Sequence, residues 1–320
     1  MRWQPDAALD ALRLRAQMLA RVRGFFADRG VLEVDTPLMC QATGTDPHLE
    51  ALALELSPGD WRYLQTSPEF AMKRLLAAGS GPIYQLCKAF RRDESGQRHN
   101  PEFTMLEWYR PGFDDGQLMD EVAALLTECL PDDSPIPDPG IARISYRDLF
   151  LQWLALDPFA ASNDELLMCA RRHTDVDGLT LSRDDILNLL MALVIEPQLQ
   201  APLFVVDFPA SQAALAQLAR DCHGNLVARR FELFVAGMEL ANGYLELTDG
   251  AEQARRFAAD NQQRQAAGLP VCAVDARLLA ALAHGLPACA GVALGFDRLV
   301  MLAAGAGHIR EVLSFVADNA

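Results

Sequence analysis

The sequence lacks any apolar stretch long enough to cross a membrane. No run approaches the roughly 18 uncharged residues that a spanning helix needs, and residues 1–6 contain no apolar segment of the kind found in signal peptides. We therefore expect a cytoplasmic protein with no membrane association.

The cysteines show none of the spacings that bind a metal or build a disulfide framework. All seven are scattered between residues 40 and 289, and no two of them form a Cys-x-x-Cys pair. We expect free, buried thiols.

Positive charge is scarce as well. The chain has 28 lysines and arginines against 43 acidic residues, which gives a net charge of −15. Broad binding to phosphate backbones depends on an excess of positive charge, so tRNA binding is unlikely. A small arginine cluster could still bind a nucleotide. With 51% hydrophobic residues over 320 positions, the chain can bury a large core.

The order of the expected elements indicates one α+β domain over residues 1–320. Strands at both ends flank a helical insertion at about residues 131–200, in which three helices are expected to begin at Ser145, Ser162 and Ser182, each followed by an acid three residues later. An antiparallel sheet flanked by helices is the expected architecture. The other expected helices cover 8–29, 67–78, 252–265 and a segment after Gly295, and the expected strands cover 31–36, 52–56, 61–65, 83–91, 102–109, 203–208, 231–246 and 292–294.

The segment 102–109 places an unusual set of side chains on one side of its strand. The residues that share this face are Phe103, Met105, Glu107 and Tyr109. An aromatic ring, a carboxylate and a phenol suit the binding of a base and an ammonium group. On spacing alone, a half-buried strand after a solvated, charged loop explains the pattern equally well.

Residues 237–247 carry Glu239 and Glu246 on either side of Asn242-Gly243. A type I′ hairpin turn at Asn-Gly is the plain structural explanation. The odd separation of the two glutamates would put them on opposite faces of an unbroken strand, so both reach one site only if Asn242-Gly243 bends the chain.

Two further segments have both a structural and a functional interpretation. Ser67-Pro68-Glu69 is typical of a helix start. Residues 291–299 predict a strand that passes through Gly295 into a helix with Arg298 in its first turn, where the backbone can approach a phosphate. The alternative for the second segment is a plain turn with a surface pair of Asp297 and Arg298.

Together these segments resemble the signature motifs of class II aminoacyl-tRNA synthetases. Phe90-Arg91-Arg92-Asp93 with RHNPEFTMLEWY at 98–109 is similar to motif 2 of lysyl-tRNA synthetase, residues 239–246 to its E-x-x-N-G-x-x-E element, and residues 291–299 to motif 3. The helix before Gly30 and the strand 31–36 resemble motif 1, which implies a homodimer.

The resemblance implies a role for each matching residue. Arg91 would bind the ATP α-phosphate and the substrate carboxylate, and Arg298 the γ-phosphate, as the catalytic pair. Phe103 would stack on adenine. Other implied ATP-binding residues are Arg92, Asp93, His99, Asn100, Glu239, Leu240 and Gly295. The implied amino-acid-binding residues are Ser67, Pro68, Glu69, Glu107, Tyr109, Asn242, Glu246 and Ala293. Glu239 and Glu246 are the implied ligands of Mg²⁺.

Two positions depart from the family pattern. Asp93 stands where the family has glutamate, and either Asp93 or the neighbouring Glu94 fills that role. Ala293 stands where motif 3 has glycine, and its methyl group would reshape the amino-acid pocket, which argues against plain α-lysine as the best substrate.

The segment before motif 1 is too short for the N-terminal anticodon-binding barrel of lysyl-tRNA synthetase, so we expect none. A catalytic domain of this kind, with PEFTMLEWYRP and Ala293, resembles the paralogues of that enzyme that modify elongation factor P. The resemblance implies that lysine, preferably (R)-β-lysine, is activated with ATP as the adenylate and joined to a lysine of elongation factor P. The alternatives are a minimal synthetase that charges tRNA and a regulatory paralogue without catalysis.

Overall fold

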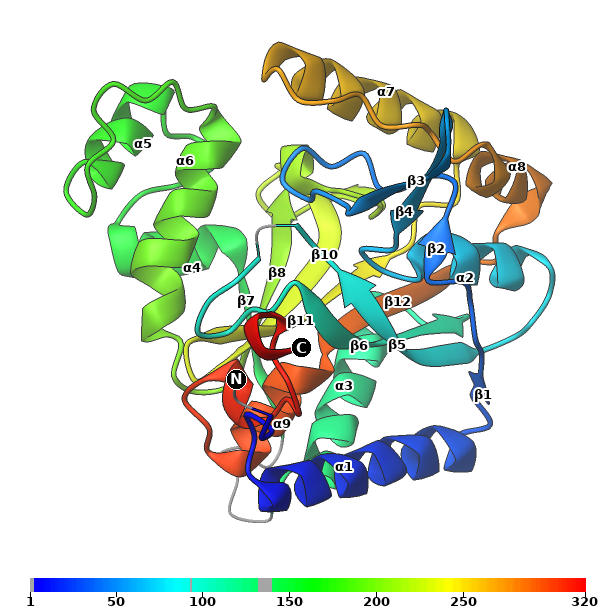
Figure 1. Ribbon diagram of the computed structural model, residues 1–320. Helices are drawn as coiled ribbons and strands as arrows, with labels where there is room; N and C mark the ends of the chain where they lie inside the picture. Colours follow the sequence, from blue (N-terminus) through cyan, green and yellow to red (C-terminus); the bar gives the residue numbers. More distant parts are fainter. Residues whose placement is uncertain (1–2, 93, 132–139) are drawn as a thin grey trace. The chain divides into compact units, whose positions relative to one another are not determined.

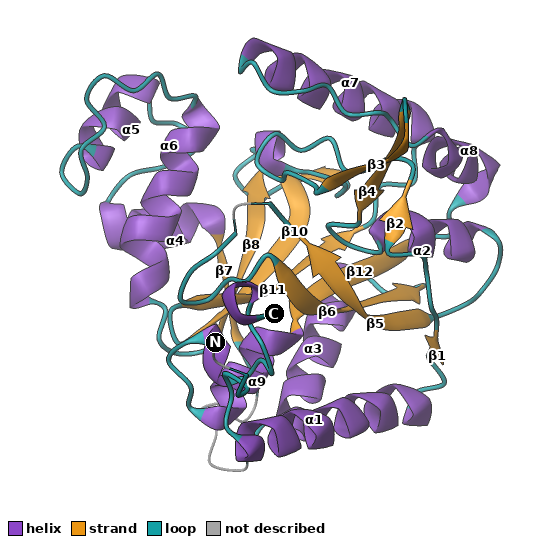
Figure 2. Ribbon diagram, viewed as in Figure 1, coloured by secondary structure: helices purple, strands orange, loops and turns teal. Residues whose placement is uncertain are grey.

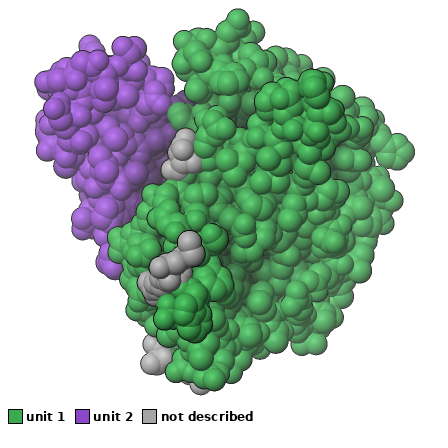
Figure 3. Space-filling view, viewed as in Figure 1, with its two compact units in different colours: residues 1–114, 124–134, 247–320 green, residues 115–123, 135–246 purple. Residues whose placement is uncertain are grey.

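The computed structural model describes residues 3–92, 94–131 and 140–320, and its Cα positions form two compact units (Figure 3). Unit 1 comprises residues 1–114, 124–134 and 247–320, and unit 2 comprises residues 115–123 and 135–246. The predicted role of Asp93 falls outside the described residues, as does most of the proline-rich segment that begins the expected insertion.

The helices and strands are labelled in Figure 1 and coloured by type in Figure 2. The α-helices are α1 (Leu9–Asp28), α2 (Glu69–Ala77), α3 (Asp115–Cys129), α4 (Tyr146–Leu154), α5 (Asn163–Ala170), α6 (Arg183–Leu190), α7 (Gly250–Ala266), α8 (Ala276–Gly285) and α9 (Phe296–Ala304). The strands are β1 (Leu32–Glu33), β2 (Met39–Cys40), β3 (Ala53–Ser57), β4 (Asp60–Leu64), β5 (Ile83–Phe90), β6 (Glu102–Pro111), β7 (Ala142–Ser145), β8 (Leu203–Pro209), β9 (Leu218–Arg220), β10 (Leu226–Val235), β11 (Met238–Leu245) and β12 (Cys289–Gly295).

In unit 1, four strands lie side by side in the order β1-β5-β6-β12. The β1–β5 pair is parallel, and the other two pairs are antiparallel. Helix α1 covers one face of these strands, because Phe26 stacks on Tyr84 with ring centroids 4.3 Å apart and meets Trp108 edge-on at 5.4 Å. The three strands β2-β4-β3 form a separate small sheet.

The opposite face of the unit 1 strands carries the polar side chains. Glu107 of β6 lies directly between Gln85 of β5 and Ala293 of β12 in the strand register. Helices α2 and α8 cover only one end of this face, where Met72, Leu278 and Leu282 pack in a cluster that includes Tyr109. The rest of the face is the setting for the candidate site.

In unit 2, the strands follow the order β11-β10-β8-β7, with β9 on the end of β10. Only β7 and β8 run parallel. Helices α4, α5 and α6 begin after Ser145, Ser162 and Ser182, whose side chains accept the N–H of the residue three positions later, as the sequence predicts. Their apolar faces pack on β8 and β10 through residues such as Phe150 and Phe208.

The expected α+β architecture with a mainly antiparallel sheet is confirmed, and so are most of the expected elements. The first strand is shorter than expected and covers only Leu32–Glu33, while α3, α8, β2, β7 and β9 were not predicted. Among the described residues, no helix is both long and apolar enough to cross a membrane. All seven cysteines are free, as expected. The expectation that the thiols are buried holds only for Cys129, Cys169 and Cys289, since Cys222 is exposed and the other three are half-buried.

Candidate active site

Arg91 follows directly after β5, and its side chain lies over the aromatic ring of β6. The guanidinium carbon is 5.0 Å from the centroid of Phe103, and Nη1 is 3.4 Å from Glu94 Oε1. The Arg91 Nε atom is buried and has no hydrogen-bond partner among the described residues. Arg91 therefore keeps a buried donor for a ligand, and Glu94 occupies the acidic position beside it.

The loop between β5 and β6 is fastened to α9 by Arg298. Its Nη2 atom lies 2.7 Å from His99 Nε2, and Nε lies 3.4 Å from the Arg98 carbonyl oxygen. Gly295 precedes α9, and a Cβ at this position would lie 3.4 Å from Arg298 Cδ. The glycine thus leaves room for the arginine to extend along the turn.

Asp297 and Arg298 do not form the surface pair that the plain interpretation predicts. Asp297 is 2% exposed, accepts the Thr104 N–H at 2.7 Å and pairs with Arg15 at 2.6 Å. Its carboxylate therefore joins α9 to β6 and α1, which leaves Arg298 directed to the loop.

Two other residues of the loop make contacts that hold the protein together. The Asn100 amide donates to the Glu102 carbonyl at 2.6 Å and accepts the Ala317 N–H at 3.1 Å. Arg92 Nη1 pairs with Glu50 at 3.1 Å, and both side chains are largely exposed. In this structure, Asn100 and Arg92 shape the loop.

Glu107 is the centre of a hydrogen-bonded group on the polar face. The carboxylate is 2% exposed and accepts the Tyr109 hydroxyl at 2.6 Å and the Ser67 hydroxyl at 2.7 Å, one on each oxygen. Ser67 also accepts the Glu69 N–H at 3.0 Å, while Pro68 is the N-cap residue of α2. The helix thus begins one residue later than the capping interpretation predicts, with Pro68 and not Ser67 at the N-cap. The Ser67 hydroxyl still accepts a backbone N–H at the start of α2 and also binds Glu107.

Glu69 lies in the first turn of α2, close to Glu107's partner Ser67. Its Oε1 atom is 2.6 Å from the ammonium of Lys73, one turn further along the helix. Lys73 is only 1% exposed. The i,i+4 spacing of the pair is visible in the sequence, but the burial of Lys73 is not. Ala293 is the direct cross-strand neighbour of Glu107, so its methyl group narrows the space above that carboxylate.

Strand β11 runs through Asn242-Gly243 without a turn. Gly243 pairs with Phe231 and Asn242 with Glu232 on β10, and the hairpin turn lies earlier, between Val235 and Met238. The expected type I′ turn at Asn-Gly is therefore wrong. Gly243 is required for another reason, because a Cβ there would lie 2.6 Å from Phe231 Cε1 and closer still to Cζ.

A register shift in the β10–β11 pair changes which residues share a face. Leu233 pairs with Ala241 but Phe234 pairs with Glu239, so Leu240 is an extra residue in β11. Because of this bulge, Glu239 lies on the same face of β11 as Asn242 and every second residue after Asn242. The expected bend at Asn242-Gly243 is thus wrong, because the bulge at Leu240 corrects the odd spacing instead.

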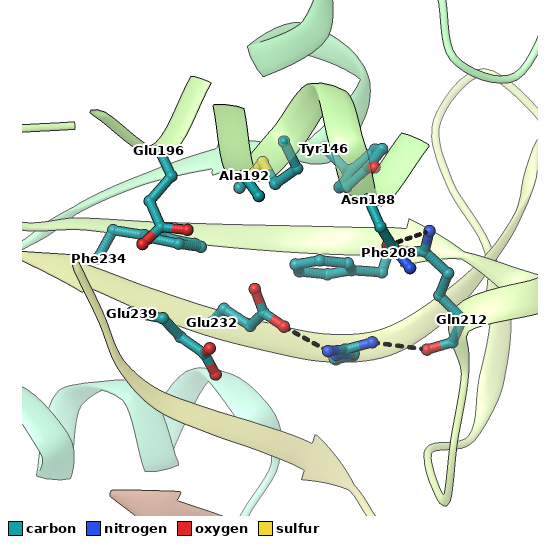
Figure 4. A pocket seen from close by; sticks show the side chains of 11 residues that line it. Tyr146, Asn188, Ala192, Glu196, Phe208, Gln212, Glu232, Phe234 and Glu239 are labelled. Carbon is teal, nitrogen blue, oxygen red and sulfur yellow. Dashed lines mark hydrogen bonds and ion pairs between the residues drawn. The ribbon is translucent and has the colours of Figure 1, made fainter. Parts of the chain in front are cut away.

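Unit 2 contains a cavity of about 100 Å³ on this face of β10 and β11, shown in Figure 4. Its lining includes Glu196, Glu232 and Glu239, which are labelled in the figure. Glu232 forms a close ion pair with Arg230 and lies 3.4 Å from the Asn242 amide nitrogen. Glu232 was not among the predicted site residues, although the charged residues Arg229, Arg230 and Glu232 interrupt the apolar residues of β10.

Burial and the charges of neighbouring side chains shift the pKa of the Glu232 carboxyl. Burial raises the pKa of the Glu232 carboxyl, the Arg230 guanidinium opposes this rise, and the Glu239 carboxylate adds to it. Three carboxylates line the cavity, and one of them, Glu232, is already paired with Arg230. Mg²⁺ commonly takes one or two protein carboxylates beside phosphate and water. In the described part of the chain, no group of three or more His, Cys, Asp or Glu side chains could hold a metal by itself.

Glu246, the other expected magnesium ligand, does not line this cavity. It follows the end of β11, is 1% exposed, and its carbonyl oxygen accepts from Gln217 Nε2 at 2.9 Å. Leu240 is buried at the bulge. Glu232 is therefore the residue that the structure places with Glu239.

Comparison with known proteins gives one family and one group of relatives. The model of the family "tRNA synthetases class II (D, K and N)" matches residues 1–319. A protein of Edwardsiella ictaluri named elongation factor P--(R)-beta-lysine ligase is 50% identical over 99% of this chain and 98% of its own length. Proteins of the same name from Salmonella typhi and Photorhabdus laumondii are each 49% identical, with the same coverage.

Proposed function

The chain belongs to the class II tRNA synthetases of the D, K and N group, and from this premise we propose that it is an ATP-dependent ligase for elongation factor P. It would activate a lysine, preferably (R)-β-lysine, and join it to a lysine side chain of that factor. The names and near-complete coverage of the relatives support this assignment. The observation that carries the substrate class is the Glu107 carboxylate, held by Ser67 and Tyr109, which suits an ammonium group.

In the first step, an oxygen of the amino-acid carboxylate attacks the α-phosphorus of ATP. A bond from that oxygen to phosphorus forms, and the bond to pyrophosphate breaks. Negative charge grows on the phosphate oxygens, and the buried donor of Arg91 stabilises it, while Arg298 binds the γ-phosphate. Phe103 stacks on the adenine, and orientation lowers the barrier further.

The acids have separate roles in the proposal. Glu69 and Glu107 bind the amino groups of the substrate in unit 1, and Ala293 favours the β-isomer by narrowing the space beside Glu107. Glu239 and Glu232 would hold Mg²⁺, which would neutralise phosphate charge. Glu246 contributes a further carboxylate to the substrate.

In the second step, the uncharged ε-amine of the acceptor lysine attacks the carbonyl carbon of the adenylate. The amide bond forms, AMP leaves with the electron pair of the broken C–O bond, and the amine loses a proton to solvent. The net charge of −15 suits a protein acceptor better than tRNA. The resemblance of α1 and β1 to motif 1 supports a homodimer, and a translation factor as acceptor supports a cytoplasmic location.

Exchange of labelled pyrophosphate into ATP tests the activation step without any acceptor. We expect exchange with (R)-β-lysine and weaker exchange with α-lysine, and Arg91→Ala should abolish both. Arg13→Ala is the matched control, because this arginine is exposed and pairs only across a helix turn with Asp10. No exchange with either isomer would favour a regulatory paralogue without catalysis.

A further inference from the structure

Lys73 stands out in a chain that uses arginine almost everywhere. The sequence has lysine only at positions 73 and 88, and the rest of its 28 basic residues are arginine. The Lys88 side chain is 40% exposed and pairs with Glu102 at 3.3 Å, whereas Lys73 is 1% exposed. A lysine this deeply buried is rare unless its charge is paired, so its position needs an explanation.

The Lys73 ammonium lies against a carboxylate of the proposed amino-acid pocket. Nζ is 2.6 Å from Glu69 Oε1, and the Glu69 side chain is 16% exposed. The Glu69 main chain is held from the other side by Ser67, whose hydroxyl also donates to Glu107. A chain of contacts therefore links Lys73 through Glu69 and Ser67 to Glu107, the second carboxylate of the proposed pocket.

We propose that Lys73 is a positioning residue for amino-acid recognition. Its ammonium occupies Oε1 of Glu69 and holds the carboxylate in one orientation, which leaves Oε2 to accept from an amino group of the substrate. This inference rests on the proposed function and assigns to Glu69 the amino group nearer the carboxylate, which is the 3-amino group of (R)-β-lysine, and to Glu107 the terminal amine.

The chemistry of the two basic side chains explains why lysine stands at position 73. An ammonium is a compact point charge that can contact one carboxylate oxygen. A guanidinium presents a planar fork that tends to bind both oxygens of a carboxylate at once. Arginine at this position would therefore compete with the substrate for Oε2 of Glu69, even though it carries the same charge.

The test uses Lys73→Met and Lys73→Arg in the full-length protein, with Lys88→Met as the control at the exposed lysine. Pyrophosphate exchange is measured with (R)-β-lysine and with 6-aminohexanoate, which keeps the carboxylate and the terminal amine but lacks the second amine. Both Lys73 variants should raise KM for (R)-β-lysine about tenfold, the effect of one lost bond to a charged group. KM for 6-aminohexanoate and for ATP should stay within about twofold, since neither contact involves Glu69 in this proposal.

Four results would overturn the proposal. Equal weakening of both amino acids would mean that Lys73 supports the fold in general. A Lys73→Arg enzyme with wild-type kinetics would mean that charge alone is sufficient. Wild-type kinetics in both variants would remove Lys73 from recognition while leaving the proposed function intact, whereas no lysine-dependent exchange in the wild type would refute the function and the inference together. Melting curves identify a variant that fails to fold, and Lys73→Arg then carries the test.

Discussion

Replacing Gly243 with alanine tests the path of β11 through the Asn242-Gly243 dipeptide. In the structure, an added Cβ would lie 2.6 Å from Phe231 Cε1, and aromatic ring atoms cannot yield in a packed strand pair. Phe231 is completely buried, and its ring packs edge-on against Phe204 at 5.6 Å. Overpacking of this kind costs about 1–3 kcal/mol, so the midpoint of urea unfolding should fall while the slope stays constant.

The decisive comparison is the double variant with Phe231→Leu. Leucine lacks the ring atoms Cε and Cζ that crowd position 243, so the double variant should recover part of the loss, with a coupling of about 0.5–3 kcal/mol. Gly24→Ala is the control, because this glycine lies in α1 with open space around it and alanine should stabilise the helix by about 1 kcal/mol. A type I′ turn at Asn242-Gly243 would also make alanine costly, but without coupling to Phe231. Strictly additive effects would therefore refute the strand assignment.

Two substitutions and one labelling experiment test the site and its surroundings. Glu232→Gln keeps the side-chain shape but removes a carboxylate from the cavity that Glu239 lines, so the Mg²⁺ concentration for half-maximal pyrophosphate exchange should rise about tenfold or more; an unchanged Mg²⁺ dependence would contradict the cation role. Ala293→Gly removes the methyl group beside Glu107 in the strand register, so the ratio of kcat/KM for (R)-β-lysine to that for α-lysine should fall. An unaltered ratio would mean that Ala293 does not contribute to selectivity. Burial, with the nearby charge of Glu107, raises the pKa of the Cys87 thiol to about 12, so it stays protonated at pH 8 and its thiolate appears only as the pH rises toward that value. Iodoacetamide followed by peptide mass spectrometry should label the exposed Cys222 at pH 8 but leave Cys87 unmodified, and rapid labelling of Cys87 at that pH would contradict its environment.

Local patterns predicted the parts of the fold that depend on nearby residues. Serine at the start of α4, α5 and α6 accepts a backbone N–H in each case, because capping involves only four consecutive residues. Alternation placed Glu107 and Tyr109 on one face of β6, and their hydrogen bond agrees with this. Helix α3 was missed despite a usable signal, since Leu118, Val122 and Leu125 recur at helical spacing and are all buried.

Features that depend on pairing between distant segments could not be predicted in this way. The bulge at Leu240 exists only in the β10–β11 register, and without it Glu239 has the wrong parity to meet Glu232. No particular amino acids mark a bulge in the sequence, so simple alternation placed Glu239 on the wrong face of this strand. Similarly, the burial of Lys73 depends on how α2 packs against the rest of unit 1, which its own sequence does not specify.

The resemblance to motif 2 identified residues that the physical patterns left ambiguous. Spacing alone could not distinguish a ligand-binding strand from a half-buried one at Phe103, and the Arg91 guanidinium over its ring is a contact between residues 12 positions apart in the numbering. Glu94 Oε1 lies 3.4 Å from Arg91 Nη1, which agrees with the alternative that Glu94 fills the acidic role of this motif. The sequence therefore identified which residues could bind a ligand, but the contacts that bring them together are known only from the fold.

Transfer of label to the acceptor tests the proposed function most directly. The purified protein is incubated with ATP and labelled (R)-β-lysine or α-lysine, and elongation factor P and lysine tRNA are offered in parallel. The account predicts that elongation factor P becomes labelled, more strongly with the β-isomer, and that tRNA does not. Labelling of tRNA alone would contradict the account and identify a minimal synthetase.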